Sequence, residues 1–246
     1  MITQVKIPIV AREEVRILPE FAYSLYGEWM RLLEPDQADK LHEQRLLNQY
    51  LNLTGRNSAQ LTVNLLTDEV AEWMIPVFQK KHDYFLTKFG CELTAGEPQI
   101  HAFGEDTIVK PFLTTQKVQN HIILHFLTPT TFKSGGRYAV FPTPELILHS
   151  AATKWNTLNF SVSAEDQEAI NLMEKSTVIT SYRLSSAYYG IKETRIQSFT
   201  GNLTLSIRAP EPVIRLFDML LNGLKFTGLG IKTSLGMGGI DTAVIR

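Results

Sequence analysis

The segment GLGIKTSLGMGG, residues 228–239, carries five glycines in twelve positions near the end of the chain. Glycine takes positive φ angles and has no side chain, so such a segment can turn several backbone N–H groups toward one phosphate. Lys232, Thr233 and Ser234 add one positive charge and two hydroxyls. A wide surface turn has the same composition. The segment matches neither the Walker nor the dinucleotide-binding glycine pattern, which disfavours a nucleotide cofactor.

The elements upstream of this glycine-rich segment follow a regular order. Hydrophobic periodicity predicts a strand, a helix, two strands, a helix and a strand over residues 120–127, 144–156, 176–189, 195–208, 210–224 and 238–245. This β-α-β-β-α-β order is typical of a ferredoxin-like domain.

The same order is predicted for the first half of the chain. Its strands and helices are expected at residues 2–10, 19–33, 35–43, 50–54, 60–66, 67–86 and 91–103. Thr67 is expected to cap the helix that Pro76 kinks. The predicted fold class is therefore α+β, with two tandem ferredoxin-like domains at residues 1–110 and 116–246. A connection within residues 105–117 joins them, and the repeat depends on element order because the halves share no sequence identity.

The overall composition indicates an ordinary globular protein. The 246 residues are 44% hydrophobic and 20% charged, and no apolar stretch approaches the roughly 18 residues that cross a bilayer. The N-terminus lacks the features of a secretory signal, so we expect a cytoplasmic protein. A lone cysteine, Cys91, forms no intramolecular disulfide and is expected to be buried.

Charge is unevenly distributed along the chain. The net charge of −1 would not by itself hold a polyanion, but residues 1–100 carry 10 basic and 14 acidic side chains, whereas residues 101–246 carry 14 and 11. A basic C-terminal region is compatible with an anionic partner, and equally with solvated surface lysines.

Four features in a fixed order carry a resemblance to a known family. The glycine-rich segment reads glycine, apolar, glycine at Gly228–Gly230 and again at Gly236–Gly238. Upstream lie FTGNLTLSIRAPE (199–211), TPTTFKSGGRYAVFPTPELILHSAATKWN (128–156), and LPEFAYSLYGEWM (18–30) with LHE (41–43). Together they resemble the CRISPR-associated endoribonucleases that cut precursor CRISPR RNA within its repeats, members of the repeat-associated RNA-binding superfamily.

The resemblance implies a specific reaction and partner. It implies a tandem ferredoxin-like fold, no metal or other cofactor, and attack of an RNA 2′-hydroxyl on the adjacent phosphate, leaving a 5′-hydroxyl and a 2′,3′-cyclic phosphate. The partner is the precursor CRISPR RNA repeat; a homodimer and contacts with other interference proteins are left open. Two rival hypotheses are a non-catalytic CRISPR RNA-binding subunit of the same superfamily and a ferredoxin-like protein-interaction module.

That reaction needs a base, an acid and a cation or N–H donors for the growing phosphorane charge. His42, in LHE, matches the family's catalytic histidine, although a histidine at a helix end is often a surface residue. The tyrosine and lysine of some members align here with Gly27 and Asn48. Tyr26, and Tyr23 one turn earlier, are the alternative hydroxyl donors, and the candidate cations are Arg45 and Lys232.

RNA-binding candidates lie in the glycine-rich segment, in a predicted loop around Gly135 and Gly136, and in a predicted hairpin. The glycine-rich segment supplies Gly228, Gly230, Lys232, Thr233, Ser234, Gly236 and Gly238, and cationic candidates elsewhere are Lys133, Arg137, Arg183, Lys192 and Arg195. Cations at hairpin tips beside Tyr188 and Tyr189 are suited to phosphate contact and base stacking, and solvated tips read the same. His121 and His125 share a strand face without a third ligand, so no metal site is predicted and partial burial is expected.

Overall fold

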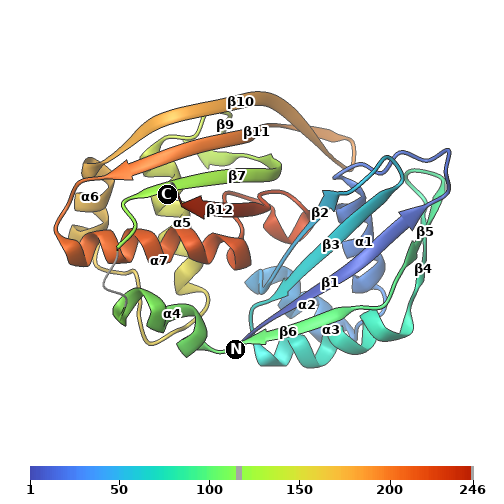
Figure 1. The fold of residues 1–246 in the computed structure, drawn as a ribbon. Coiled ribbons are helices and arrows are strands. Elements are labelled where there is room, and N and C mark those ends of the chain that lie inside the picture. Colours follow the sequence, from blue (N-terminus) through green and yellow to red (C-terminus); the bar gives the residue numbers. More distant parts are fainter. Residues whose placement is uncertain (115–117, 245–246) are drawn as a thin grey trace.

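Two antiparallel sheets lie side by side in the computed structural model, which describes residues 1–114 and 118–244 (Figure 1). The first half of the chain forms a six-stranded sheet and the second half forms a four-stranded sheet, each with its own helices. The predicted α+β class with tandem ferredoxin-like units is confirmed by this architecture. No helix among the described residues is both long and apolar enough to cross a membrane.

The first sheet has the order β2-β3-β1-β5-β4, and β6 pairs along the other part of β1. Its elements are β1 (Ile2–Ala11), α1 (Phe21–Met30), α2 (Pro35–Gln44), β2 (Leu47–Leu53), β3 (Ser58–Leu65), α3 (Asp68–Lys80), β4 (Asp83–Leu86), β5 (Cys91–Ala95) and β6 (Gln99–Phe103). Alternation along β1 buries Val5, Ile7 and Ile9 under α1 and α3. Cys91 is buried, as predicted.

The second sheet has the order β10-β11-β7-β12, the ferredoxin-like arrangement. Its elements are β7 (His121–Thr130), β8 (Phe132–Ser134), β9 (Arg137–Ala139), α5 (Pro144–Asn156), α6 (Gln167–Ser176), β10 (Thr177–Ile191), β11 (Thr194–Ile207), α7 (Glu211–Thr227), a 3₁₀ turn (Thr233–Leu235) and β12 (Ile240–Val244). The small β8–β9 hairpin stands between β7 and α5.

Several predicted boundaries were wrong. The helix expected over 67–86 ends at Lys80, and residues 83–86 form β4, whose Tyr84 and Leu86 alternate with exposed neighbours and pair with β5. The extended segment 91–103 is two strands, and α6, which Asp166 caps, was missed.

The predicted connection between the halves contains a further helix. Residues 105–114 form α4 (Glu105–Thr114), which packs against α7 through a core that includes Ile108 and Val109. Residues 115–117 of that connection, and residue 245 of the predicted last strand, lie outside the described residues. The division at 1–110 and 116–246 stays a prediction.

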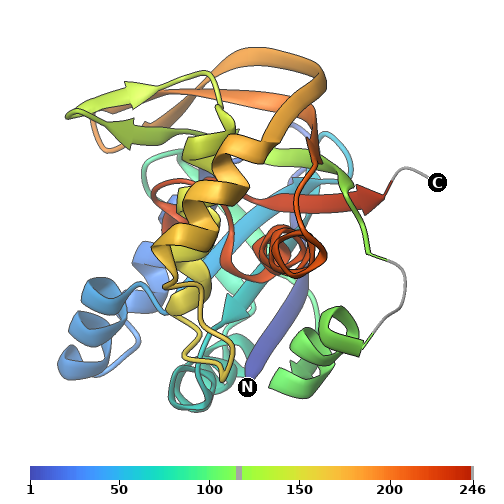
Figure 2. The ribbon, with the colours of Figure 1, turned by 90° about the vertical axis from the view of Figure 1, so that its left-hand side faces the viewer.

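Polar side chains of β2 and β3 join the two halves. The Asn48 amide donates to the carbonyl oxygen of Phe226 at 3.0 Å, and the Asn64 amide donates to that of Lys225 at 3.1 Å. The long β10–β11 hairpin crosses from the second half to the first (Figure 1) and lies at the top of the molecule in Figure 2. The Tyr189 hydroxyl donates to the carbonyl oxygen of Pro19 at 3.1 Å. These contacts fix how the glycine-rich segment faces α1 and α2.

Candidate active site and RNA interface

A cavity of about 470 Å³ opens between the two halves and contains most of the predicted catalytic residues. We call it the His42 cavity. Its lining comes from α1, α2, β9, the β10–β11 turn and the glycine-rich segment: Tyr23, Tyr26, Gly27, Met30, His42, Tyr138, Ile191, Lys192, Thr194, Ile196, Lys232 and Leu235. A histidine near the start of the chain and a lysine near its end therefore line one cavity.

His42 is held at the exposed end of a well-capped helix. Pro35 occupies the first turn of α2, and Glu34 and Gln37 form a reciprocal capping box that satisfies its N-terminal amides. Leu41 is fully buried and anchors the last turn, so that the next residue, His42, is exposed toward the cavity. Arg45 ends the helix in the left-handed conformation, with φ of 54°.

Tyr26 is among the residues that line the His42 cavity, although its hydroxyl oxygen itself is buried. Its side chain is buried, and its hydroxyl oxygen has no hydrogen-bond partner among the described residues. Burial raises the pKa of Tyr26 to about 12, so the group stays protonated and acts as a donor near neutral pH. A Cβ on the neighbouring Gly27 would meet no atom within 4 Å, so the aligned position of the family's tyrosine is open space.

The glycine-rich segment packs between the halves, and three of its glycine amides are bonded to protein acceptors. The amide of Gly228 donates to the Leu224 carbonyl oxygen at 2.7 Å, that of Gly230 to Ser150 Oγ at 3.0 Å, and that of Gly238 to the Pro129 carbonyl oxygen at 3.1 Å. The Gly228, Gly230 and Gly238 amides are therefore already bonded to protein acceptors, so phosphate contact by the segment stays a prediction for its other amides and side chains.

Tight packing against neighbouring residues explains why these positions are glycine better than phosphate binding does. A Cβ at Gly236, whose φ is 100°, would overlap the Tyr189 hydroxyl and Ala22 of α1. Thr233 is buried, and its hydroxyl accepts a hydrogen bond from Lys154 Nζ at 2.9 Å. Lys232 is exposed and lines the His42 cavity, and Ser234 is half-buried. The segment thus delivers a lysine side chain to the cavity through tightly packed glycines.

The other two aligned or predicted partners lie elsewhere. Asn48 is buried at the junction of the halves, where its amide binds the Phe226 carbonyl oxygen and its Oδ1 lacks a partner among the described residues. Arg45 lines a different cavity, described below, together with Lys133. The structure does not bring Arg45 into the His42 cavity.

The remaining predicted RNA-binding side chains are exposed on the second half. Lys133 and Arg137 lie on the β8–β9 hairpin, Arg183 lies on β10, and the Arg195 guanidinium stacks on the Tyr188 ring at 4.6 Å. Lys192 lies in the β10–β11 turn and lines the His42 cavity.

Tyr188 and Tyr189, which the sequence grouped together, differ in exposure. Tyr188 is 52% exposed, whereas Tyr189 is fully buried and its hydroxyl donates to the Leu235 carbonyl oxygen at 2.6 Å. Only Tyr188 of this pair is placed to stack on a base.

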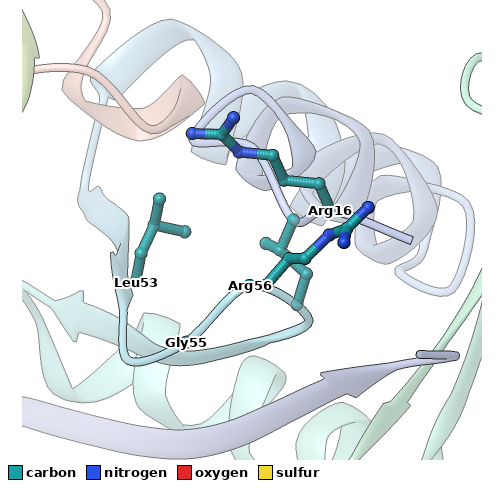
Figure 3. A pocket seen from close by; sticks show the side chains of 5 residues that line it. Arg16, Leu53, Gly55 and Arg56 are labelled. Atoms are coloured by element: carbon teal, nitrogen blue, oxygen red, sulfur yellow. The ribbon is translucent and has the colours of Figure 1, made fainter. Parts of the chain in front are cut away.

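A cavity beside the β2–β3 turn and the two histidines of β7 lie outside the predicted site. A cavity of about 530 Å³ lies beside the β2–β3 turn, where Arg16 extends over the space on the side of Leu53 and Arg56 points the other way (Figure 3). His121 is exposed, against prediction, and His125 is half-buried beside Asn202. Among the described residues, no three histidine, cysteine, aspartate or glutamate side chains are grouped to hold a metal.

Sequence reasoning missed two residues that line these cavities. Tyr138, on β9, lines the His42 cavity, and Lys154, on α5, lies beneath the glycine-rich segment. Tyr138 could have been suggested by its position directly after Arg137, which was predicted to bind RNA. Nothing in the sequence distinguishes Lys154, since a single lysine in an amphipathic helix is usually a solvated side chain.

The tandem ferredoxin-like fold with this glycine-rich junction is that of CRISPR RNA-processing proteins. A family model described as CRISPR-associated endoribonuclease Cas6 matches residues 124–240. The Cas6 endoribonuclease of Streptococcus thermophilus is 30% identical over 223 residues, 90% of each chain, and that of Mycobacterium tuberculosis is 26% identical over 88% of this chain and 69% of its own. The chain belongs to the Cas6 family of CRISPR-associated endoribonucleases.

Solved structures agree with this fold. A Cas6 product complex has a TM-score of 0.79 at 16% identity and covers 99% of this chain and 100% of its own. Thermus thermophilus Cas6 has a TM-score of 0.76 at 20% identity, covering 99% and 98%. Family membership excludes a protein-interaction module unrelated to RNA.

Proposed function

We propose that this chain is a metal-independent endoribonuclease that cuts precursor CRISPR RNA within its repeats. In this reaction the ribose 2′-oxygen forms a bond to the adjacent phosphorus while the bond to the 5′-oxygen breaks. The 2′-hydroxyl proton passes to a base and the 5′-oxygen receives a proton, so the products are a 2′,3′-cyclic phosphate and a 5′-hydroxyl. The observation that carries this proposal is the His42 cavity, which is lined both by His42 of the first half and by Lys232 of the second.

Each group in the cavity suits one role. His42 transfers a proton at the 2′-hydroxyl or the 5′-oxygen, and positioned proton transfer contributes roughly 10²- to 10⁴-fold. Lys232 stabilises the negative charge that grows on the phosphorane oxygens. The Tyr26 hydroxyl is buried and has no partner among the described residues, and in this proposal it donates a hydrogen bond to the same phosphate or to the leaving oxygen once its side chain turns toward the cavity.

The repeat RNA lies across the exposed cations of the second half in this proposal. Two solved Cas6 neighbours are described as a product complex and a substrate mimic complex, which supports repeat RNA as the ligand here. Lys133, Arg137, Arg183, Lys192 and Arg195 contact phosphates and set the register of the RNA, with Tyr188 available for stacking. We place this activity in the cytoplasm.

A test of the reaction uses repeat RNA in excess EDTA, with the His42→Ala variant for comparison. Cutting should persist under chelation, and the products should carry cyclic phosphate and 5′-hydroxyl ends. His42→Ala should retain RNA binding while cleavage falls by at least about 10²-fold. His101→Ala, an exposed histidine on β6, is the matched control and should cut normally. Loss of cutting in EDTA would falsify the metal-independent mechanism.

A second candidate is a CRISPR RNA-binding subunit that does not cut. Gly27 and Asn48 favour it, because they stand where some family members have a tyrosine and a lysine, and Asn48 is committed to the junction of the halves. Under this alternative the wild-type protein and His42→Ala would bind repeat RNA equally and release no product with a cyclic phosphate end.

A further inference from the structure

A second cavity, of about 290 Å³, lies on the other side of the glycine-rich segment. We call it the Lys154 cavity. It is bounded by α5, by β8 of the small hairpin and by the corner between α2 and β2. Its charged lining consists of Arg45, Lys133 and Lys154, and no carboxylate is among its lining residues. Three cations around one small cavity without an acidic side chain leave an excess of positive charge.

Lys154 is the most unusual of these cations. Its ammonium donates to the Thr233 hydroxyl at 2.9 Å and to the Thr227 carbonyl oxygen at 3.3 Å, which are both uncharged acceptors. Burial and the charge of Arg45 lower the pKa of Lys154 to about 8. A lysine that only capped the C-terminus of α7 would need no second cation beside it, because that cation disfavours the charged form.

Several residues that line the two cavities have a left-handed backbone conformation. Four non-glycine residues have positive φ among the described residues, namely Arg45, Asn159, Lys192 and Lys232. Three of them are cations that line the His42 cavity or the Lys154 cavity. Arg45 takes this conformation where α2 ends and Lys192 where the β10–β11 hairpin turns, so these turns set where the cationic side chains start.

The two cavities are neighbours along the chain. Gly230 and Ile231 line the Lys154 cavity, and the next residue, Lys232, lines the His42 cavity. Consecutive Cα atoms are about 3.8 Å apart, so an RNA strand that passes over Lys232 would reach both cavities. On the other wall, Arg45 follows His42 by three residues in the same way.

We propose that the Lys154 cavity is a second phosphate-binding site, which holds a backbone phosphate of the RNA strand next to the segment bound at His42. This inference rests on the proposed function for the identity of the strand. Arg45 and Lys133 contact the phosphate from the exposed rim, and Lys154 supplies charge from the floor. Arg45 thereby serves RNA binding and not the phosphorane. Phosphate recognition of this kind is independent of sequence.

The test measures how salt weakens binding of an uncut RNA. The probe is a fluorescent repeat RNA with a 2′-deoxy residue at the cut position, titrated with full-length protein at several salt concentrations. Arg45→Gln and Lys133→Gln should each weaken binding about tenfold and reduce the slope of log affinity against log salt by about 0.7 for each lost phosphate. Lys175→Gln, an exposed lysine on α6, is the control and should behave as wild type.

Cleavage of unmodified RNA at saturating protein separates the outcomes. Under the proposal, Arg45→Gln weakens RNA binding by a larger factor than it slows cleavage at saturating protein. It is overturned if Arg45→Gln and Lys133→Gln bind as tightly as Lys175→Gln, or if Arg45→Gln loses rate with full affinity. Lys154→Met should also reduce the slope of log affinity against log salt. Because Lys154 is half-buried and its replacement could disturb folding, the exposed variants Arg45→Gln and Lys133→Gln decide the result. If the wild type binds but does not cut, the proposed reaction fails while the slopes still report on this site.

Discussion

The Gln49 side-chain amide donates hydrogen bonds at 2.9 Å to the carbonyl oxygen of Ser234 and at 2.9 Å to that of Ala22. Gln49 lies on β2, Ala22 lies in the first turn of α1, and Ser234 belongs to the turn that follows Lys232. One fully buried side chain thus ties the lysine-bearing segment to the helix that carries Tyr26. The geometry of the His42 cavity depends on this tie.

Replacing Gln49 should loosen the cavity as well as the fold. Gln49→Leu leaves two carbonyl oxygens without their donor, which costs about 1–3 kcal/mol of unfolding free energy. Because the position of Lys232 is no longer fixed, the cleavage rate at saturating protein should also fall. Gln60→Leu, a half-buried glutamine on β3, is the control. Urea unfolding and single-turnover cleavage measure the two effects, and an unaffected rate in a destabilised Gln49→Leu would contradict the positioning role.

Two glycines should respond to alanine in opposite directions. Gly27 lies within α1 and an added Cβ meets nothing within 4 Å, so Gly27→Ala should raise the unfolding free energy by up to about 1 kcal/mol through helix propensity. Gly236→Ala forces a Cβ into Tyr189 and Ala22 at a φ of 100° and should cost about 1–3 kcal/mol or more. Thermal unfolding of both variants checks this pair, and equal midpoints would show that the segment relaxes freely.

Much of the fold could be predicted because its signals are local. Helix α5 has the predicted bounds, since the Thr143 hydroxyl oxygen caps it by accepting a hydrogen bond from the Leu146 amide and Pro144 opens it. Strand β4 was missed because its four residues continue a helical pattern, and pairing with β5 decides their conformation.

The candidate site was only partly predictable. His42 and Lys232 could be selected from the chemistry of their types and from the resemblance. The separation of His42 from Arg45 into two cavities could not be predicted, although only two residues lie between them in the sequence. It depends on how the halves pack, and contacts such as Gln49 with Ser234, 185 residues apart, have no local signal.

Removing the Tyr26 hydroxyl should separate stability from activity. The hydroxyl has no partner among the described residues, so Tyr26→Phe should leave the unfolding free energy unchanged or slightly higher. If the hydroxyl donates to the reacting phosphate, cleavage at saturating protein should fall at least about tenfold. Tyr23→Phe, on the same helix and the same cavity, is the comparison. Normal cleavage by Tyr26→Phe would remove Tyr26 from the mechanism.

Asp218 should make stability depend on pH below neutrality. Burial raises the pKa of this carboxyl from 3.8 to about 6, although the Gln119 amide, Asn222 and the Arg215 charge oppose the shift. The folded chain then binds more protons than the unfolded chain between about pH 4 and pH 6, so the contribution of Asp218 is present below pH 4 and is lost as pH rises through 6. Asp218→Asn cannot titrate.

The measurement is the difference in melting temperature between variant and wild type at two pH values. The melting temperature of Asp218→Asn relative to wild type should be higher at pH 7.5 than at pH 4. The other carboxyls titrate in both proteins, so their effects cancel in this difference. Asp39→Asn, an exposed aspartate on α2, should show no such trend. A difference for Asp218→Asn that stays constant across pH would mean that its pKa is not raised.

Lys232 should be less important for stability than for cleavage. Its φ of 58° suits glycine, so Lys232→Gly relieves a strain of about 1–2 kcal/mol and loses a similar or smaller amount through the freer unfolded chain. The unfolding free energy should therefore stay within about 1 kcal/mol of wild type, whereas Glu72→Gly, an exposed site inside α3, should lose about 1 kcal/mol. Cleavage by Lys232→Gly should fall by about 10²-fold or more as the charge near the phosphorane is lost. A variant that unfolds early and still cuts at the wild-type rate would reverse both assignments, making Lys232 a structural residue outside the reaction.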